Sequence, residues 1–354
     1  MENARLLVSQ LVKHLVQLLT RNAKDNKFLI KEIGQLFAVR FLYIKGEKNL
    51  KKLMSTLLSA LLVVSMSVSS VSALTMAEIK GKNRYETSAL IADKQDYTTA
   101  ILVNSTNSIA DGLSASALAG AANAPILLVK QNEIPTSVEL RLECTNKIYI
   151  IGSENAISKN IEDRLKKSGF IVSRIGGSNR YETSVNVAKE VKRVKGGASE
   201  TFIVNGVKGE ADAMSISSVA ARDSAPVILT NGKSITSEAK KIVNSIPNKY
   251  AIGLQGVMDE NLVESVDATR IGGSNRFETN KKIIKAFYKN VSSYHLSKSD
   301  QLVDALAASP MTKYSPIVLV NKNSDKSILK GATKMTALGG IDKETIEKCK
   351  KAAQ

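Results

Sequence analysis

The stretch RIGGSNRYETSVNVA, residues 174–188, recurs almost unchanged as RIGGSNRFETNKKI from Arg270, and a weaker copy, EIKGKNRYETSALIA, begins at Glu78. The arginine inside each copy lies at position 84, 180 or 276, so two equal intervals of 96 residues separate the copies. This period is longer than that of short solenoid repeats and matches the size of a small compact domain. The sequence therefore predicts three sister modules rather than one large enzyme domain.

Short apolar runs alternate with helical segments after each copy of the motif. Runs such as TFIVN, APVILT and KYAIG are typical of strands that are covered on both faces of a parallel sheet. The third copy is shortened between Val320 and Met335, which predicts that its middle helix is missing. The pattern predicts an α/β architecture with parallel-type sheets in three modules, at residues 74–173, 174–269 and 270–354.

The repeated motif has a local physical explanation. The glycine pairs Gly176-Gly177 and Gly272-Gly273 end a strand and let the backbone turn where side chains would clash. Asn179 is placed to cap the following helix, and Glu182 stands three residues later, as in a capping box. The other two copies carry the same pairs, Asn83 with Glu86 and Asn275 with Glu278.

The arginine of the motif, which is Arg84, Arg180 or Arg276, lies in the first helical turn and is not needed for the cap. Two roles remain open for it. It could pair with a carboxylate of its own or of a neighbouring module, or it could face an anionic ligand at the positive end of the helix.

Two other patterns recur in each module. Asp111, Asp212 and Asp304 each open an alanine-rich helix just after a strand, where a carboxylate stabilises the helix dipole. A proline followed by three aliphatic residues is the second pattern, and by itself it indicates a core strand. The aliphatic residues are Ile126, Leu127 and Leu128, then Val227, Ile228 and Leu229, and then Ile317, Val318 and Leu319.

The beginning of the chain indicates export. A basic flank precedes an apolar run that ends in Val71-Ser72-Ala73, a small-x-small sequence typical of a signal peptidase site. We therefore expect a signal peptide over residues 50–73 and a mature chain that starts near Leu74. A retained N-terminal anchor is the alternative. Residues 1–49 form a basic leader, which we interpret as the result of a start codon assigned too early.

The whole chain of 354 residues has a formal net charge of +17. Residues 1–73 hold 11 basic and 4 acidic residues, so the remainder keeps a net charge of +10. An excess of basic over acidic residues favours an anionic partner. Nucleic acid is disfavoured as that partner, because its binding would need basic clusters interleaved with aromatics, whereas only 5% of the residues are aromatic and the chain carries an export signal.

Few residues offer catalytic chemistry, so an enzyme is not expected. His14 and His295 are the only histidines, which excludes a multi-histidine metal site, and no Gly-x-Ser-x-Gly sequence exists to place a serine nucleophile. Gly232-Lys233-Ser234 resembles the end of a phosphate-binding loop, but Val227 occupies the place of its first glycine. No cofactor is expected. Three copies of one module favour a protein that binds a repetitive polymer, because several weak contacts to the same polymer raise the overall affinity.

The motif RIGGSNRYETS, followed by a strand, an Ala-Asp helix start, an Ala-Pro-Ile/Val-Leu strand and a Tyr-x-Ile-Gly strand, resembles the cell wall-binding repeat 2 family of Gram-positive, especially clostridial, surface proteins. The resemblance covers the chain from about Thr75 to its end. It implies three tandem Toprim-like (Rossmann-like) modules arranged as a pseudo-threefold trimer. It also implies non-covalent anchoring to an anionic, teichoic-acid-like wall polymer, a secreted location at the cell wall or S-layer, and contact with S-layer proteins.

In that family the Ile-Leu-Leu-type segment is associated with polymer binding. The resemblance therefore implies this role for residues 126–128, 227–229 and 317–319. The second and third of these segments depart from the Ile-Leu-Leu pattern, and the first motif copy has Lys80-Gly81-Lys82 in place of Gly-Gly-Ser. These departures predict unequal contributions from the three modules. The alternative function is a cell-wall hydrolase of the N-acetylmuramoyl-L-alanine amidase type, or its wall-targeting fragment.

Overall fold

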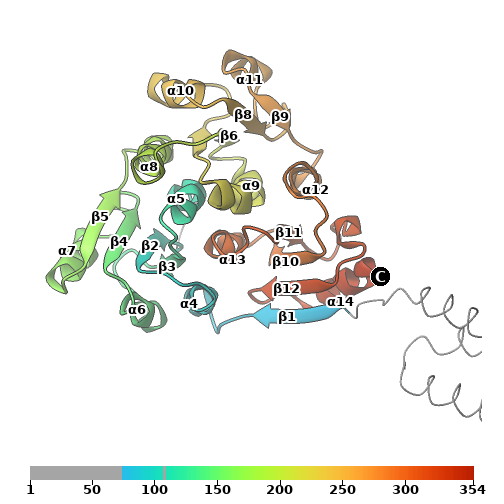
Figure 1. The fold of residues 1–354 in the computed structure, drawn as a ribbon, viewed down its shortest axis with the longest axis horizontal. Coiled ribbons are helices and arrows are strands. Elements are labelled where there is room, and N and C mark those ends of the chain that lie inside the picture. The colour runs from blue at the N-terminus through green and yellow to red at the C-terminus, as the bar shows by residue number, and fades with distance from the viewer. Residues whose placement is uncertain (1–73, 107–108) are drawn as a thin grey trace, which may run out of the picture. The chain divides into compact units, whose positions relative to one another are not determined.

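The computed structural model describes residues 74–106 and 109–354. The predicted leader and signal peptide lie outside these residues. The described residues belong to one compact unit, Ser72–Gln354, which contains three four-stranded sheets in which all the pairings are parallel. Helices cover both faces of the sheets (Figure 1). The α/β architecture with three parallel sheets that the sequence predicts is therefore confirmed.

Each sheet takes the strand order in which the first strand after the motif lies between the next two. The first sheet has the order β3-β2-β4-β5, the second β7-β6-β8-β9 and the third β1-β12-β10-β11. The strands are β1 (Thr75–Ile79), β2 (Thr99–Asn104), β3 (Ile126–Val129), β4 (Lys147–Ile151), β5 (Ile171–Ile175), β6 (Glu200–Asn205), β7 (Val227–Thr230), β8 (Asn248–Ile252), β9 (Thr269–Ile271), β10 (Ser293–Lys298), β11 (Ile317–Val320) and β12 (Lys334–Leu338).

The helices fall into three groups. The motif helices begin at the repeated arginines, and they are α4 (Arg84–Ala92), α8 (Arg180–Lys195) and α12 (Arg276–Phe287). The acidic helices carry the repeated aspartates, and they are η1 (Asp111–Ser114) with α5 (Ala115–Ala121), α9 (Glu210–Asp223) and α13 (Val303–Ala308). The remaining helices are α6 (Thr136–Leu142), α7 (Lys159–Lys167), α10 (Ser237–Asn244), α11 (Glu260–Ser265), η2 (Ser327–Leu329) and α14 (Lys343–Ala353).

The three acidic helices meet between the sheets, where one hydrophobic cluster joins the inner faces of all three sheets (Figure 1). Small residues allow these helices to approach closely. A Cβ atom on Gly120 of α5 would lie 1.8 Å from the carbonyl oxygen of Ala221 on α9, so only glycine fits at this contact. Separate clusters fill the outer faces of the first and second sheets. The alanine-rich composition of these helices thus produces a shared core.

Strand β1 pairs with β12, at the opposite end of the described chain, with Met76 beside Met335 in the register. In the repeat, β1, β5 and β9 are equivalent, because each ends within the first residues of a copy of the motif. Strands β5 and β9 complete the sheet of the preceding repeat, while β1 completes the sheet of the last one. The third sheet therefore joins the two ends of the described chain.

The motif helices also cover the outer edges of the sheets. Strands β3, β7 and β11 lie at a sheet edge, and each packs against one motif helix. Ser88 Oγ accepts a hydrogen bond of 3.2 Å from the backbone of Leu128, and Ser184 Oγ accepts one of 3.0 Å from Leu229. At the equivalent position, Asn280 accepts from Leu319 at 3.1 Å and donates to the carbonyl of Ile317 at 3.0 Å. These side chains pair backbone groups that an edge strand otherwise leaves unpaired.

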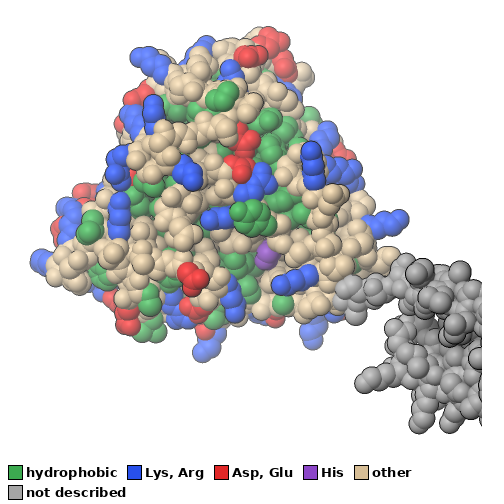
Figure 2. Space-filling view, in the orientation of Figure 1, with side chains coloured by type: hydrophobic (Ala, Val, Ile, Leu, Met, Phe, Trp, Pro, Cys, Tyr) green, Lys and Arg blue, Asp and Glu red, His purple; other side chains and the backbone are tan. Residues whose placement is uncertain are grey.

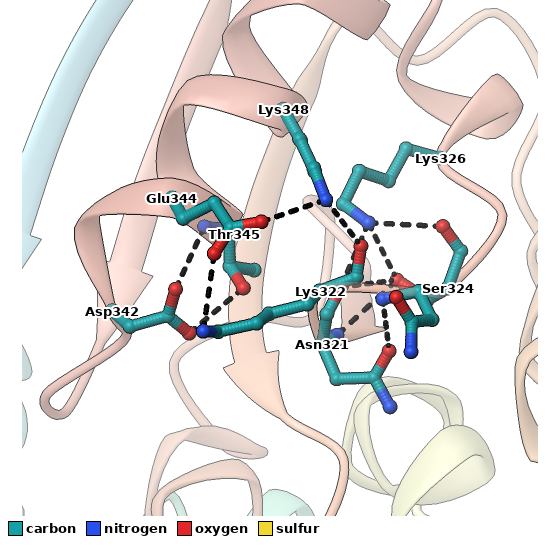
Figure 3. A network of polar contacts seen from close by, with 9 residues as sticks. Asn321, Lys322, Ser324, Lys326, Asp342, Glu344, Thr345 and Lys348 are labelled. Atoms are coloured by element: carbon teal, nitrogen blue, oxygen red, sulfur yellow. Dashed lines mark hydrogen bonds and ion pairs between the residues drawn. The ribbon is translucent and has the colours of Figure 1, made fainter.

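The third module lacks its middle helix, as predicted, and has only the short turn η2 between β11 and β12. A buried lysine organises the replacement loop (Figure 3). The ammonium group of Lys326 donates to the carbonyls of Asn321 at 2.8 Å and Ser324 at 2.9 Å, and to the Ser324 hydroxyl at 3.0 Å. Burial lowers the pKa of Lys326. The ammonium group thus satisfies carbonyl groups that a helix would have paired internally.

Replacing Asn280 with Ala would leave a buried N–H of Leu319 and a buried C=O of Ile317 without partners. We expect Asn280→Ala to lower the free energy of unfolding by about 2–6 kcal/mol, since each of the two unsatisfied groups costs about 1–3 kcal/mol. Ser184→Ala removes a single edge bond and serves as the matched comparison, with an expected loss of about 1–2 kcal/mol. Urea unfolding gives both values, and equal losses would contradict the role assigned to the asparagine.

Candidate functional site

The motif loop is fixed by the capping pattern that the sequence predicts. Asn179 Oδ1 accepts hydrogen bonds from the backbone of Tyr181 at 3.0 Å and Glu182 at 3.1 Å. Glu182 accepts from the backbone and the hydroxyl of Ser178, at 2.8 and 2.6 Å. The glutamate therefore reaches the residue before the cap rather than the cap itself. These hydrogen bonds lower the pKa of Glu182. Asn83 and Asn275 cap α4 and α12 in the same way.

The glycines of the motif press this loop against the end of a neighbouring strand. A Cβ atom on Gly176 would lie 2.7 Å from the backbone of Gly152, which follows β4, and one on Gly177 would lie 2.6 Å from Glu182 Cβ. The second glycine pair, Gly272 and Gly273, is equally crowded. The start of each motif helix is thus held in one position relative to the sheet.

Each repeated arginine points its guanidinium at the backbone just after the first strand that follows its motif, which is β2, β6 or β10. Arg84 donates to the carbonyl of Ser105, Arg180 to that of Gly206 at 2.5 Å, and Arg276 to that of Ser299 at 2.5 Å. In the part of the chain that the structure describes, these carbonyls are their hydrogen-bond partners, and no ion pair joins the arginines to a carboxylate. Of the two roles left open for these arginines, a direct carboxylate pair is not seen within the described residues.

The three guanidinium groups remain accessible. Arg84 and Arg276 are exposed and Arg180 is half-buried. Each guanidinium has five N–H donors, and one N–H group is bound to the carbonyl in each case. The remaining donors are able to bind anionic oxygens in the forked geometry that arginine favours. Figure 2 shows basic side chains both around the outline and in the middle of the visible face, with fewer acidic ones.

Each motif helix packs against the acidic helix of the preceding repeat, and we call this contact a junction. The junctions join α8 to η1 and α5, α12 to α9, and α4 to α13. Asp212 and Asp304 are buried in the second and third of them, and Asp111 on η1 is half-buried. The third junction links the last repeat to the first, so the junctions form a closed set.

Burial raises the pKa of Asp212 and of Asp304 to about 6. A hydrogen bond from Thr279 and the charge of Arg276 act in the opposite direction on Asp212. For Asp304 the opposing charges are those of Lys298 and Arg84. Motif arginines from one repeat therefore act electrostatically on aspartates of the repeat before it.

A repeated glycine at the end of a strand completes each junction, and sequence reasoning missed it. Gly152, Gly253 and Gly339 all have positive φ angles, of 105°, 119° and 68°. A Cβ atom on Gly339 would lie 2.0 Å from Asp304 Oδ2, and one on Gly253 would lie 3.1 Å from Asp212 Oδ2. The final glycine of the runs YIIG, YAIG and TALG was the available signal.

The aliphatic triplets lie in the edge strands and form part of the core. Residues 126–128, 227–229 and 317–319 are each at most 2% exposed. Their backbones are held by the motif helices through Ser88, Ser184 and Asn280. The structure therefore brings the triplets next to the motif helices but does not expose their side chains beside the arginines.

Residues 74–106 and 109–354 offer few side-chain groups that could act in catalysis or bind a metal ion. No three His, Cys, Asp or Glu side chains gather there to hold a metal ion. His295 lies in β10, half-buried, with Nδ1 2.9 Å from the carbonyl oxygen of Ser315, and burial lowers its pKa. Over the same residues, no helix is both long and apolar enough to span a bilayer.

The raised pKa values of the two buried aspartates predict a pH-dependent stability. A raised pKa means that the folded state keeps a proton that the unfolded chain has released, so this stabilisation is complete below a pH of about 4 and is lost as the pH rises through about 6. Asp212→Asn stays neutral and still accepts a hydrogen bond. We expect it to be more stable than the wild type at about pH 7.5, by up to about 3 kcal/mol, and equally stable near pH 4.

Thermal unfolding across this pH range measures the effect. Asp300→Asn is the matched control, because Asp300 is exposed. A wild-type and an Asp212→Asn profile that run parallel from pH 4 to about 7.5 would contradict the expectation.

Comparison with known proteins identifies a family whose model matches all three repeats. Cell wall binding domain 2 matches residues 78–162, 174–263 and 270–343, one match for each copy of the motif. The chain is 30% identical over 256 residues to the N-acetylmuramoyl-L-alanine amidase LytC of Bacillus subtilis, covering 70% of this chain and 50% of the relative. It is 30% identical over 269 residues to the amidase enhancer of the same organism, covering 74% of this chain and 37% of the relative.

Solved structures of Clostridium difficile proteins have the same fold. Cwp6 matches with a TM-score of 0.73 at 28% identity, over 80% of this chain and 48% of the other. Cwp8 matches with a TM-score of 0.72 at 31% identity, over 84% of this chain and 55% of the other. The chain spans half or less of the length of the two B. subtilis relatives. From three family matches that coincide with three repeated sheets and junctions, we conclude that the chain belongs to the cell wall binding domain 2 family and is a wall-associated surface protein.

Proposed function

We propose that the chain anchors non-covalently to an anionic, teichoic-acid-like polymer of the Gram-positive wall and catalyses no reaction of its own. We further propose that it is exported, with a mature chain that starts near Leu74, and that it contacts S-layer proteins at the surface. The family match and the net positive charge support this partner.

The observation that carries the proposal is that an arginine occurs at the same place in all three repeats. Arg84, Arg180 and Arg276 occupy the same place in three equivalent junctions, with one N–H group bound to a backbone carbonyl and the others accessible. Nothing in the helix caps requires them. A polymer with regularly spaced anionic groups can engage more than one such arginine, and each additional contact raises the overall affinity by effective concentration.

We propose that the aliphatic triplets support binding without touching the polymer. Their side chains are buried, so their effect reaches the surface through the edge strands. Those strands hold the motif helices, whose first residues are the arginines. A change in a triplet would therefore disturb the fold first and binding as a consequence.

A second candidate follows from the names of the two B. subtilis relatives, an amidase and an amidase enhancer. The chain matches half or less of each, so it would be the wall-targeting part of a hydrolytic system. Incubation of purified chain with walls separates the two functions. An anchor leaves the turbidity of the wall suspension unchanged, whereas an amidase lowers it and releases new amino groups.

Loss of the arginines should abolish retention on walls while the fold persists. We expect Arg180→Ala to weaken wall binding several-fold, and the Arg84→Ala, Arg180→Ala, Arg276→Ala triple variant to lose it, since contacts to a repetitive polymer reinforce one another. Sedimentation with purified walls, before and after extraction of the anionic polymer, measures retention. Arg164→Ala, which removes an exposed arginine of α7, is the control and should bind normally.

Two results would contradict the arginine proposal. One is full retention of the folded triple variant. The other is binding of the wild type that survives extraction of the anionic polymer, because the partner would then be another wall component.

Ile228→Ala tests the supporting role of the triplets. Ile228 is fully buried in β7, so we expect its truncation to lower the free energy of unfolding by about 2–5 kcal/mol. Wall binding should fall only in proportion to the unfolded fraction, as followed by circular dichroism at the binding temperature. A fully folded Ile228→Ala protein that no longer binds would instead give this side chain a direct part in recognition.

A further inference from the structure

A groove of about 500 Å³ lies between α8 and α10, on the outer side of the second sheet. Its apolar floor includes Ala198 and Ile242, which are half-buried, and the buried Pro226. Its rim carries Lys189, Lys192 and Lys241. An adjoining hollow along α10 is also lined by Lys241, together with Lys240. The groove lies apart from the junctions and is not needed for the anchoring contact proposed above.

Most of these lysines have no anionic partner. Lys189 forms an ion pair of 2.5 Å with Glu238. Within the described residues, no ion pair or hydrogen bond of the side chain is seen for Lys192, Lys240 or Lys241. Three ammonium groups on the rim of the groove and a fourth in the adjoining hollow create a local positive potential that a single glutamate does not neutralise.

The equivalent place in the first module has the opposite character. Asp93 and Asp96 line a hollow of about 570 Å³ there, at positions 96 residues before Lys189 and Lys192. Along the facing helix, Glu139 and Leu140 stand 101 residues before Lys240 and Lys241. Three acidic residues and one leucine of the first module are thus replaced by four lysines in the second.

The first module also joins the two walls of its hollow. Arg141 on α6 binds Asp93 at the end of α4 through two hydrogen bonds, of 2.9 and 2.6 Å. In the second module the corresponding residues are Ile242 and Lys189, which cannot form such a pair. No such pair crosses the groove there, and beside it Gly196 and Gly197 have no atom within 4 Å of where a Cβ would stand. The third module has no helix equivalent to α10, so it forms no such groove.

We propose that the groove between α8 and α10 binds a sugar phosphate unit of an anionic glycan, as a second contact specific to the second module. The lysine rim would bind the phosphate, and the apolar floor would accept the aliphatic face of the sugar ring. This proposal rests on the proposed wall-polymer function for its biological partner. The groove itself is testable without walls.

The test uses the purified chain and glucose 6-phosphate as the probe. We expect the probe to shift the amide resonances of Gly196 and Gly197 in NMR spectra with millimolar affinity, and added salt to weaken binding. Glucose and inorganic phosphate, tested alone, should each bind at least several-fold more weakly. Equal affinity for inorganic phosphate would overturn the assignment of a sugar phosphate.

Two variants and one control probe the groove. Lys192→Glu with Lys241→Glu should lower the affinity at least tenfold. Lys189→Asp with Ile242→Arg introduces the ion pair of the first module. It puts a carboxylate on the rim and removes an apolar side chain from the floor, so it should lower the affinity while the fold remains. Lys285→Asp is the matched control, because Lys285 is the exposed equivalent of Lys189 on α12 and faces no second helix. Unchanged affinity in both groove variants would overturn the proposal.

Wall binding separates this proposal from the proposed function. If both hold, the Lys192→Glu, Lys241→Glu variant leaves walls at a lower salt concentration than the wild type. If it leaves at the same concentration while the arginine triple variant fails to bind, the groove is excluded as a polymer contact and the anchor function stands. If the wild type binds the probe but not the walls, the anchor function fails and the groove remains a sugar phosphate site.

Discussion

The described structure depends on the contact between each motif helix and the edge strand beside it. An edge strand with aliphatic side chains and open backbone groups would invite aggregation in isolation. Here a helix covers it, and a side chain from that helix pairs its backbone. The same helix starts with the arginine and packs on the acidic helix of another repeat. One contact therefore protects the sheet, places the cation and joins the repeats.

The junctions combine a buried acid with an accessible base, and the two have different energetic consequences. Burial of Asp212 and Asp304 costs stability near neutral pH. The arginines lie in the exposed part of the junction, where binding an anion carries a small desolvation penalty. A site of this kind is held rigidly by its glycines and caps, so little entropy is lost when a ligand binds. Stability is thus lower at the places where recognition would occur.

Much of the fold follows from the sequence alone, because the chain contains its own comparison. The 96-residue interval, the short apolar runs and the Asn–Glu caps predict three parallel sheets with capped helices, and the shortened third copy predicts a missing helix. The same physical reasoning identifies residues 126–128 as a core strand, and their burial agrees with it. The site is less predictable. Periodicity does not tell which aspartate Arg276 acts on, because that interaction forms between repeats. Nor does it tell that Gly339 must leave space for Asp304, because the two residues lie far apart along the third repeat.

The groove of the second module was hidden for a related reason. Lysines spaced along α8 and α10 look like ordinary solvated residues until the two helices are placed side by side. Only then does their contrast with Asp93 and Arg141 become visible. Duplication preserved the scaffold of the modules while their outer surfaces changed charge. The three sister modules therefore present different outer surfaces.

The pairing of β1 with β12 has a consequence for how such a protein can change over evolutionary time. Each repeat lends its first strand to the sheet of the repeat before it, and the first repeat lends its strand to the last. A gene segment that encodes a single repeat therefore does not encode a complete sheet. An isolated repeat would lack the fourth strand that another repeat supplies to its sheet. The strand beside that gap would then become an exposed edge. After recombination that adds or deletes one repeat, the strand of the first repeat must again pair with the sheet of the last one. This requirement favours inheritance of the three repeats together.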